Sequence, residues 1–244
     1  MVKSQAHHGR EPVDAAQAPT VLALETSTAA CSVALSVRGA AYADHRIGPR
    51  EHNRLILPMV DALLKSAGVD RRDLDAVAFG RGPGSFTGVR IAAGVAQGIG
   101  LGLSIPVVPV STLAVLAHAA LAVHPDVIGV LATIRSRADE VYMGGYRFDS
   151  QRCLTLVPEC VMSATQRELP ECVDSTWWTV GDGVGHFALS LAALRCRADE
   201  TLLPTATGVL TLAIRAISDG ETVGPAQALP VYLQGTRPWR KLAD

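Results

Sequence analysis

The stretch Gly80–Arg90 reads GRGPGSFTGVR and lies between two segments of different pattern. The run before it, LDAVAFG at 74–80, is apolar and predicts a buried strand. The segment after it is rich in small apolar residues and predicts a long helix from about Thr87 to Leu103. A strand, a glycine-rich loop and a helix in this order are typical of phosphate-binding α/β proteins. The loop therefore raises the question of whether it binds a nucleotide or only shapes the start of a helix.

The loop matches neither of the two best-defined phosphate motifs. A P-loop requires Lys and then Ser or Thr after its last glycine, whereas Val89 and Arg90 stand there in this chain. A dinucleotide-binding loop requires G-x-G-x-x-G, and the spacing here is G-x-G-x-x-x-G. Two interpretations stay open: a nest of backbone amides that binds an anion, and a tight turn capped by Ser85 or Thr87.

The predicted helix carries glycine at every fourth position, at Gly94, Gly98 and Gly102. Each glycine costs about 1 kcal/mol of helix stability relative to alanine, so packing must compensate. Close packing on the sheet or on the preceding helix is one explanation, and a helix contact across a subunit interface is another. The two are compatible.

The rest of the first half predicts an antiparallel meander followed by a helix and parallel strands. The expected strands before the loop lie at 21–27, 31–38 and 40–47, and the expected helix lies within 50–68. In the helix Leu55, Met59 and Leu63 recur at intervals of four, Gly68 is a plausible stop, and Pro58 either kinks the helix or marks its first turn. With IPVVPV at 105–110 the order becomes β-β-β-α-β-α-β, which is that of a ribonuclease-H-like lobe.

A second, smaller α/β lobe is expected from residue 112 to 224. Its predicted elements are a helix at 112–123, strands at 127–136 and 140–148, an apolar segment at 154–162, a strand at 176–182, and helices at 185–194 and 206–218. The first lobe then spans 20–111, joined by 225–235. Residues 1–19 are expected to be a disordered extension and 236–244 a tail.

Composition indicates a globular protein with no strong field for nucleic acid. Of the 244 residues 48% are hydrophobic and 18% charged, and the net charge is −1. The five cysteines form no C-x-x-C pair and are expected to be reduced thiols, as in the cytoplasm. Residues 91–125 lack Asp, Glu, Lys and Arg, but prolines and glycines interrupt them, so we expect a buried helix and strand rather than a membrane span.

Four segments together resemble the bacterial TsaB family, also called YeaZ. They are LALETSTAACSVAL from 22, REHNRLILPMVDALL from 50, AFGRGPGSFTGVRIAAGVAQGIGLGLSIPVVPVSTL from 78, and PVYL from 230. The resemblance implies the two-lobed actin/Hsp70/sugar-kinase fold. It also implies a non-catalytic subunit that pairs with the paralogue TsaD and the ATPase TsaE during threonylcarbamoyl transfer to the tRNA adenosine next to the anticodon.

The same resemblance implies where partners and ligands go. The N-lobe helices would contact TsaD, or a second copy when the chain is alone, while tRNA is met only through the complex and ATP is handled by partners. The residues that match the expected contact are Glu51, His52, Asn53, Leu55, Ile56, Pro58, Met59, Val89, Ala93, Gly94 and Gly98. The signature loop that would hold the second helix is Gly80, Arg81, Gly82, Pro83, Gly84, Ser85, Phe86, Thr87, Gly88 and Arg90.

Several groups that catalysis would need are replaced or missing in the sequence. The related catalytic subunit holds a metal with two histidines four apart, and here Ile56 follows His52 at that distance, so we expect no metal site. A vestigial phosphate turn is expected at Glu25, Thr26, Ser27 and Thr28, with Glu where family members usually carry Asp.

The second lobe points the same way. Arg135 stands where a carboxylate is usual in the family, and GDGVG at 181–185 is better explained as a plain turn than as an adenosine site. A small-molecule kinase or ATPase of the same fold remains the alternative function. A peptidase has no support, because the sequence contains no zinc motif and no G-x-S-x-G elbow.

Overall fold

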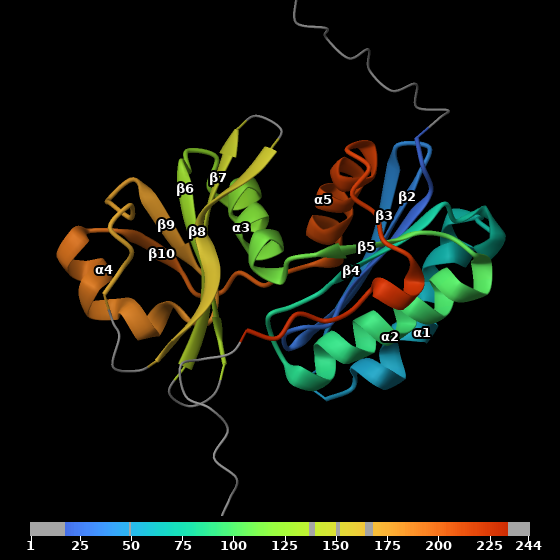
Figure 1. Ribbon diagram of the computed structural model, residues 1–244, viewed down its shortest axis with the longest axis horizontal. Helices are drawn as coiled ribbons and strands as arrows, with labels where there is room; N and C mark the ends of the chain where they lie inside the picture. The colour runs from blue at the N-terminus through green and yellow to red at the C-terminus, as the bar shows by residue number, and fades with distance from the viewer. Residues whose placement is uncertain (1–17, 49, 137–139, 150–151, 164–167, 234–244) are drawn as a thin grey trace, which may run out of the picture.

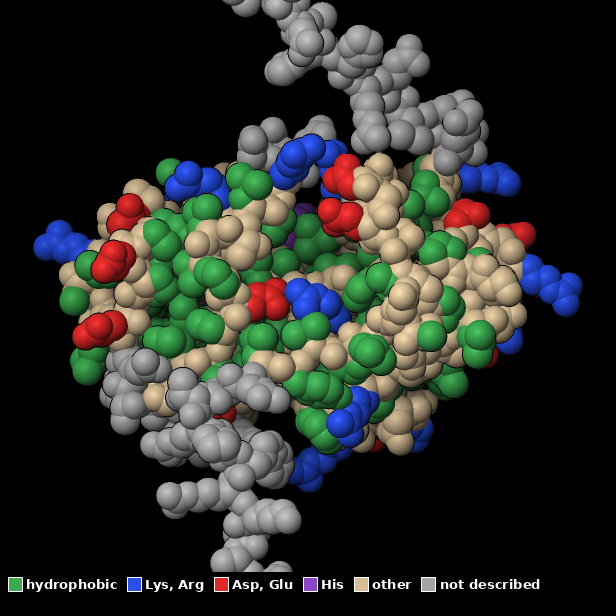
Figure 2. Space-filling model, in the orientation of Figure 1, with side chains coloured by type: hydrophobic (Ala, Val, Ile, Leu, Met, Phe, Trp, Pro, Cys, Tyr) green, Lys and Arg blue, Asp and Glu red, His purple; other side chains and the backbone are tan. Residues whose placement is uncertain are grey.

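The computed structural model describes residues 18–48, 50–136, 140–149, 152–163 and 168–233. Two lobes, each built on a five-stranded sheet, lie side by side (Figure 1). Between them the surface is hollowed, as the space-filling view shows (Figure 2). Apart from Ala18 and Pro19, the predicted N-terminal extension lies outside the described residues, and so does the predicted tail.

The first sheet has the order β3-β2-β1-β4-β5. Its strands are β1 (Val21–Glu25), β2 (Ala30–Val37), β3 (Ala40–Ile47), β4 (Ala76–Gly80) and β5 (Val107–Val110). The first three strands pair antiparallel, which confirms the predicted meander. Strands β1, β4 and β5 are parallel, as crossover helices between them require.

Helices cover both faces of this sheet. Along β1, Leu22 and Leu24 pack toward α1 (His52–Ala67) and α2 (Phe86–Leu103), whereas Val21 and Ala23 pack toward α5 (Ala206–Ser218). This division follows from the period of two along a strand. The sequence placed residues 206–218 in the second lobe. The structure corrects this, because the buried face of α5 lies on β1, β2, β4 and β5.

Local signals explain where α1 begins and ends. Gly68 adopts φ +66° and donates its backbone N–H to the last carbonyls of the helix, so the predicted stop is confirmed. Pro58 lies inside the helix, so the prediction that it marks the first turn was wrong. A short 3-10 turn, η2 (Arg71–Asp73), capped by Asp70, then leads into β4.

The second sheet has the order β10-β9-β6-β7-β8. Its strands are β6 (Gly129–Arg135), β7 (Glu140–Asp149), β8 (Arg152–Ser163), β9 (Trp177–Val180) and β10 (Arg197–Asp199). One face is covered by α3 (Thr112–Val123), and the other by the 3-10 turn η3 (Val184–Phe187) and α4 (Ala188–Leu194). A last 3-10 turn, η4 (Pro225–Gln227), returns to α2.

The charge-free segment 91–125 is divided among three elements: the end of α2, β5 and α3. By length and composition alone α2 could cross a membrane, but 33% of its residues are buried inside this chain. One face of α2 packs on the first sheet, through Ala92, Ala93 and Ala96. Its apolar character therefore has a partial explanation in the fold itself.

Candidate functional site

The signature loop lies directly on the turn that follows β1. Three glycines allow this approach, because a Cβ at Gly80 would overlap the Glu25 carboxylate and one at Gly88 would overlap the Thr26 carbonyl oxygen. A Cβ at Gly84 would lie 2.5 Å from the carbonyl oxygen of Ser27. The glycines are thus needed for contact between two parts of the chain, and this contact leaves no room for a phosphate at the turn.

Hydrogen bonds join the loop to the turn. The backbone N–H of Ser85 donates to the Ser27 carbonyl at 2.7 Å, and the Thr26 hydroxyl donates to the Gly88 carbonyl at 2.7 Å. Glu25, Thr26 and Ser27 are all at most 1% exposed. The predicted vestigial phosphate turn is therefore filled by protein.

Glu25 is completely buried under this loop. One carboxylate oxygen accepts the backbone N–H of Ser27 at 2.7 Å, and the other lies 3.4 Å from the Thr112 hydroxyl, which donates to it. Burial raises the pKa of Glu25 above its usual range, although these hydrogen bonds oppose the rise. A carboxyl group held in this way is suited to a structural role rather than to binding a hydrated metal ion.

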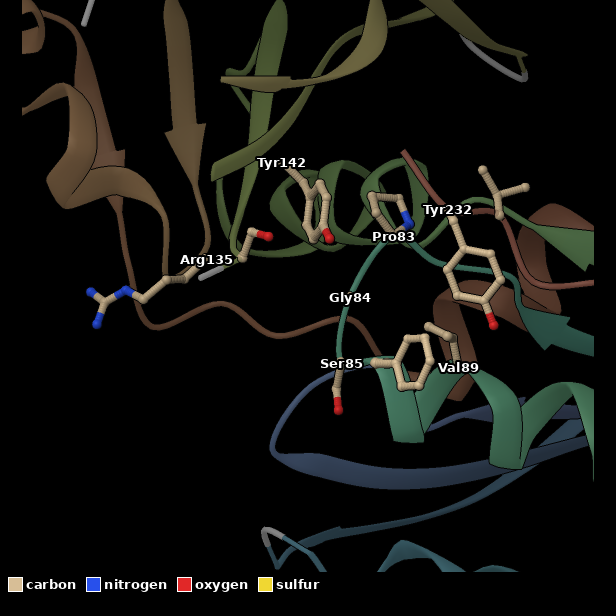
Figure 3. A pocket seen from close by; sticks show the side chains of 10 residues that line it. Pro83, Gly84, Ser85, Val89, Arg135, Tyr142 and Tyr232 are labelled. Atoms are coloured by element: carbon tan, nitrogen blue, oxygen red, sulfur yellow. The ribbon is translucent and has the colours of Figure 1, made fainter. Parts of the chain in front are cut away.

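The start of α2 faces a small pocket between the lobes. Ser85 caps the helix by accepting the N–H of Gly88 at 3.4 Å, which decides between the two predicted caps. The pocket has a volume of about 360 Å³, and Figure 3 shows Tyr142 of the second lobe opposite Tyr232 across it. Phe86 is 59% exposed, with the Arg90 guanidinium 3.6 Å from its ring centroid.

Arg135 is among the residues that line this pocket, but its guanidinium points away from it (Figure 3). Its backbone N–H donates to the Asp182 carboxylate at 2.7 Å, and its guanidinium lies 3.4 Å from the Asp182 carbonyl oxygen. Asp182 belongs to the predicted GDGVG turn, where Gly181 adopts φ +96°. The Arg135 cation is therefore held by the second lobe.

The predicted interface residues of α1 fall on two different faces of the helix. His52, Ile56 and Met59 are buried, with exposed fractions of 7%, 1% and 1%. His52 lies with Nε2 3.2 Å from the Ala30 carbonyl oxygen, inside the first lobe. These three side chains hold α1 against the sheet, and in the isolated chain they are not accessible to a partner protein. A Met59→Asp substitution would therefore bury a charge in the core of the first lobe.

The other predicted residues of α1 are accessible. Glu51, Asn53 and Pro58 are exposed and Leu55 is half-buried. Leu57, which was not among the predicted contact residues, is 52% exposed. A signal for it was present, because Leu57 lies off the stripe formed by Leu55, Met59 and Leu63.

The glycines of α2 face outward. A Cβ at Gly94, Gly98 or Gly102 would meet no atom within 4 Å, so these positions make no packing contact with the sheet or with α1. Val89 and Ala93, by contrast, are buried. Leu101, beside the stripe, is 74% exposed. Close packing on the sheet or on the preceding helix therefore does not explain these three glycines, and a contact across a subunit interface is the explanation that stays open.

No group of three or more His, Cys, Asp or Glu side chains in the described part of the chain is placed to hold a metal ion. His52 has a backbone carbonyl rather than another metal-ligating side chain as its partner. Its position is explained by packing and by that hydrogen bond.

Two mixed sheets flanked by helices, with the first turn of the first lobe filled by a glycine loop, define an α/β protein of the actin/Hsp70/sugar-kinase class. Residues 46–178 match the TsaD family, described as tRNA N6-adenosine threonylcarbamoyltransferase. The chain is 40% identical over 231 residues to the tRNA threonylcarbamoyladenosine biosynthesis protein TsaB of Escherichia coli K12, covering 91% of this chain and 97% of that one. The chain belongs to the TsaB (YeaZ) family.

Two further relatives agree with this assignment. The TsaB protein of Haemophilus influenzae is 36% identical over 231 residues, covering 91% of this chain and 97% of its own. A Pseudomonas aeruginosa crystal structure, described as an uncharacterized protein with similarity to peptidase YeaZ, superposes with a TM-score of 0.81 at 43% identity. It covers 88% of this chain and 100% of its own.

Proposed function

We propose that this chain is the non-catalytic scaffold subunit of a tRNA-modifying complex that forms threonylcarbamoyladenosine. It pairs with a TsaD-type transferase, which carries the chemistry, and the pair recruits the ATPase TsaE. Family membership supports a role in forming threonylcarbamoyladenosine, because the relatives from Escherichia coli and Haemophilus influenzae are named tRNA threonylcarbamoyladenosine biosynthesis protein TsaB. The match of residues 46–178 to the transferase family supports pairing of two similar folds.

The outward glycine stripe of α2 is the observation that carries the proposal. Gly94 and Gly98, in the helix interior, cost about 2 kcal/mol together relative to alanine, and close packing within the described part of the chain does not recover this cost. A surface without side chains lets a second helix approach closely, and the exposed Leu101, three residues from Gly98 on the same helix, adds apolar area beside it. Helices α1 and α2 lie side by side, so both contribute to one face (Figure 1).

The contact that we propose consists of the accessible residues on this face. On α1 these are Glu51, Asn53 and Pro58, with Leu55 and Leu57 beside them. On α2 they are Gly94, Gly98 and Gly102. His52, Ile56 and Met59 hold α1 against the sheet and keep this face in place.

The filled turn supports a role without catalysis. A nucleotide phosphate at residues 25–28 would have to displace the signature loop, which is hydrogen-bonded to the turn. Glu25 has no exposed oxygen with which to bind magnesium, and Arg135 supplies no carboxylate in the second lobe. ATP is therefore bound by the partner subunits, and the net charge of −1 leaves tRNA contacts to them as well.

Size-exclusion chromatography with light scattering tests the pairing. The wild-type chain should form a heterodimer with the TsaD protein of the same organism, and TsaE with ATP should join it. Gly98→Glu should abolish the heterodimer, because a charged side chain would enter the closest approach of the two helices. Ala193→Glu, at an exposed position on α4, is the matched control and should leave the heterodimer intact.

Two results would contradict the proposal. Heterodimer formation by Gly98→Glu at wild-type affinity would remove α2 from the interface. Calorimetric binding of ATP and magnesium by the isolated chain would favour the kinase or ATPase alternative. The same chromatography on the chain alone tests the expected homodimer, which Gly98→Glu should convert to a monomer.

A further inference from the structure

Arg81, the second residue of the signature loop, has its backbone fixed in the first lobe. Its N–H donates to the Val110 carbonyl oxygen at 2.8 Å, at the end of β5. Its own carbonyl accepts the N–H of Val231 at 2.8 Å. The side chain therefore starts from a point that two hydrogen bonds hold in place.

From this point the side chain crosses to the second lobe. The Arg81 guanidinium lies 3.4 and 3.5 Å from the two carboxylate oxygens of Glu159, on β8. The two side chains are 28% and 14% exposed and lie in a groove of about 900 Å³ between the lobes. Figure 2 shows basic and acidic side chains meeting in the middle of this hollowed face.

Glu159 is in turn held by Tyr146, on the neighbouring strand β7. The Tyr146 hydroxyl donates to Glu159 at 3.0 Å, and Tyr146 is 2% exposed. Burial first, and then the charge of Glu159, raise the pKa of Tyr146, so its hydroxyl stays protonated and remains a donor. Glu159 thus receives a hydrogen bond from its own lobe and an ion pair from the other.

The strand around Tyr146 is shaped for this contact. The β7–β8 register shifts on either side of Gly145, which re-aims the following side chain. A Cβ at Gly144 would lie 2.9 Å from the Tyr146 hydroxyl, so glycine leaves space for it. The same hydroxyl lies 3.4 Å from the Ser111 hydroxyl, which caps α3 where the chain passes between the lobes.

We propose that Arg81 is a positioning residue, which fixes the angle between the two lobes by pairing with Glu159 as held by Tyr146. Ion pairs such as Arg54–Glu51 and Arg71–Asp61 join neighbours on the surface of one lobe, where exposure weakens them. The Arg81–Glu159 pair is more buried and joins different sheets. The arginine of the signature loop thereby acts across the groove, away from the outward face of α2, and its role does not require a partner protein.

Pulsed electron paramagnetic resonance measures the angle directly. Spin labels on a ketone-bearing residue introduced at Lys65 in α1 and Ala193 in α4 report the distance between lobes and leave the five cysteines in place. The variants are Arg81→Met, which keeps the apolar stem, and Glu159→Gln, which keeps the shape. Arg81→Lys is the conservative variant, and Arg54→Met is the matched control for loss of an arginine.

The wild type, Arg81→Lys and Arg54→Met should share one narrow distance distribution. Arg81→Met and Glu159→Gln should both broaden it, because each removes the ion pair while the protein stays folded. A distribution that is unchanged in both variants would overturn the proposal. The proposal would also fail if Arg81→Met lowered the melting temperature and left the distance unchanged, since that is the result of a purely stabilising contact.

Discussion

Replacing Gly94 and Gly98 by alanine should stabilise the isolated chain, although both changes fall in a motif expected to mediate binding. Each new methyl group would enter open space, because a Cβ at either position meets no atom within 4 Å. Both glycines lie in the interior of an 18-residue helix. The substitution therefore gains helix propensity without a steric penalty.

The size of the effect follows from helix propensity. Each substitution should add about 1 kcal/mol, and the pair about 2 kcal/mol, to the free energy of unfolding. For a chain of this length 1 kcal/mol corresponds to about 2–4 °C, so the double variant should melt about 4–8 °C higher. The isolated chain at concentrations where it is monomeric is the sample to use, because a dimer would bury the same positions.

Gly100→Ala is the control, on the same helix but on its inner face. Its Cβ would lie 2.7 Å from the Val107 side chain and 3.3 Å from the Ile105 carbonyl oxygen, so this variant should melt lower than the wild type. Differential scanning calorimetry of the three proteins gives the comparison. The reasoning is refuted if Gly94→Ala/Gly98→Ala is destabilised, because the stripe would then be packed within the chain.

The remaining predictions concern buried groups of the first lobe. Met59→Asp should prevent folding, because it buries a charge in the core at a cost of several kcal/mol. Leu57→Asp, two positions away at a side chain that is 52% exposed, should change the free energy of unfolding by less than about 0.5 kcal/mol. Thermal melts followed by circular dichroism compare the two variants, and a folded Met59→Asp would contradict the placement of α1. Because burial raises the pKa of Glu25, the folded chain binds the carboxyl proton of Glu25 more tightly than the unfolded chain does. The stability that this proton contributes is greatest below the ordinary carboxyl pKa, and it is lost as the pH rises through the raised pKa. Glu25→Gln should remove this dependence, so that the variant gains on the wild type in urea midpoints as the pH increases; a difference independent of pH would count against it.

The first lobe could be predicted closely because its signals are local. The meander, the stop of α1 at Gly68 and the helix after the loop each depend on period and turn residues that a short window contains. The lobe to which α5 belongs could not be predicted this way, since its apolar stripe fits either sheet. Strand β10, with three residues, is too short to show a period.

The candidate site was predicted in its location more than in its detail. An apolar stripe on a helix shows that a face is covered, but not whether the cover is the chain's own core or another protein. Ile56 and Met59 belong to the first kind, while Gly94 and Gly98 turn outward. The sequence predicted that Glu25 lies at a phosphate turn. Only the fold shows that the signature loop packs against its carboxylate and fills the place of the phosphate.

Because the turn after β1 is filled by the signature loop, the conformation of the first lobe does not depend on a ligand bound at this turn. In a protein whose lobes close on a diffusible ligand, the geometry varies with the supply of that ligand. Here the occupant of the turn is tethered, because Gly84 and Gly88 belong to the same chain as Thr26 and Ser27. A tethered occupant has an effective concentration that no metabolite pool changes. The position of the loop, and with it the start of α2, accordingly does not depend on whether a diffusible ligand is available to fill this turn.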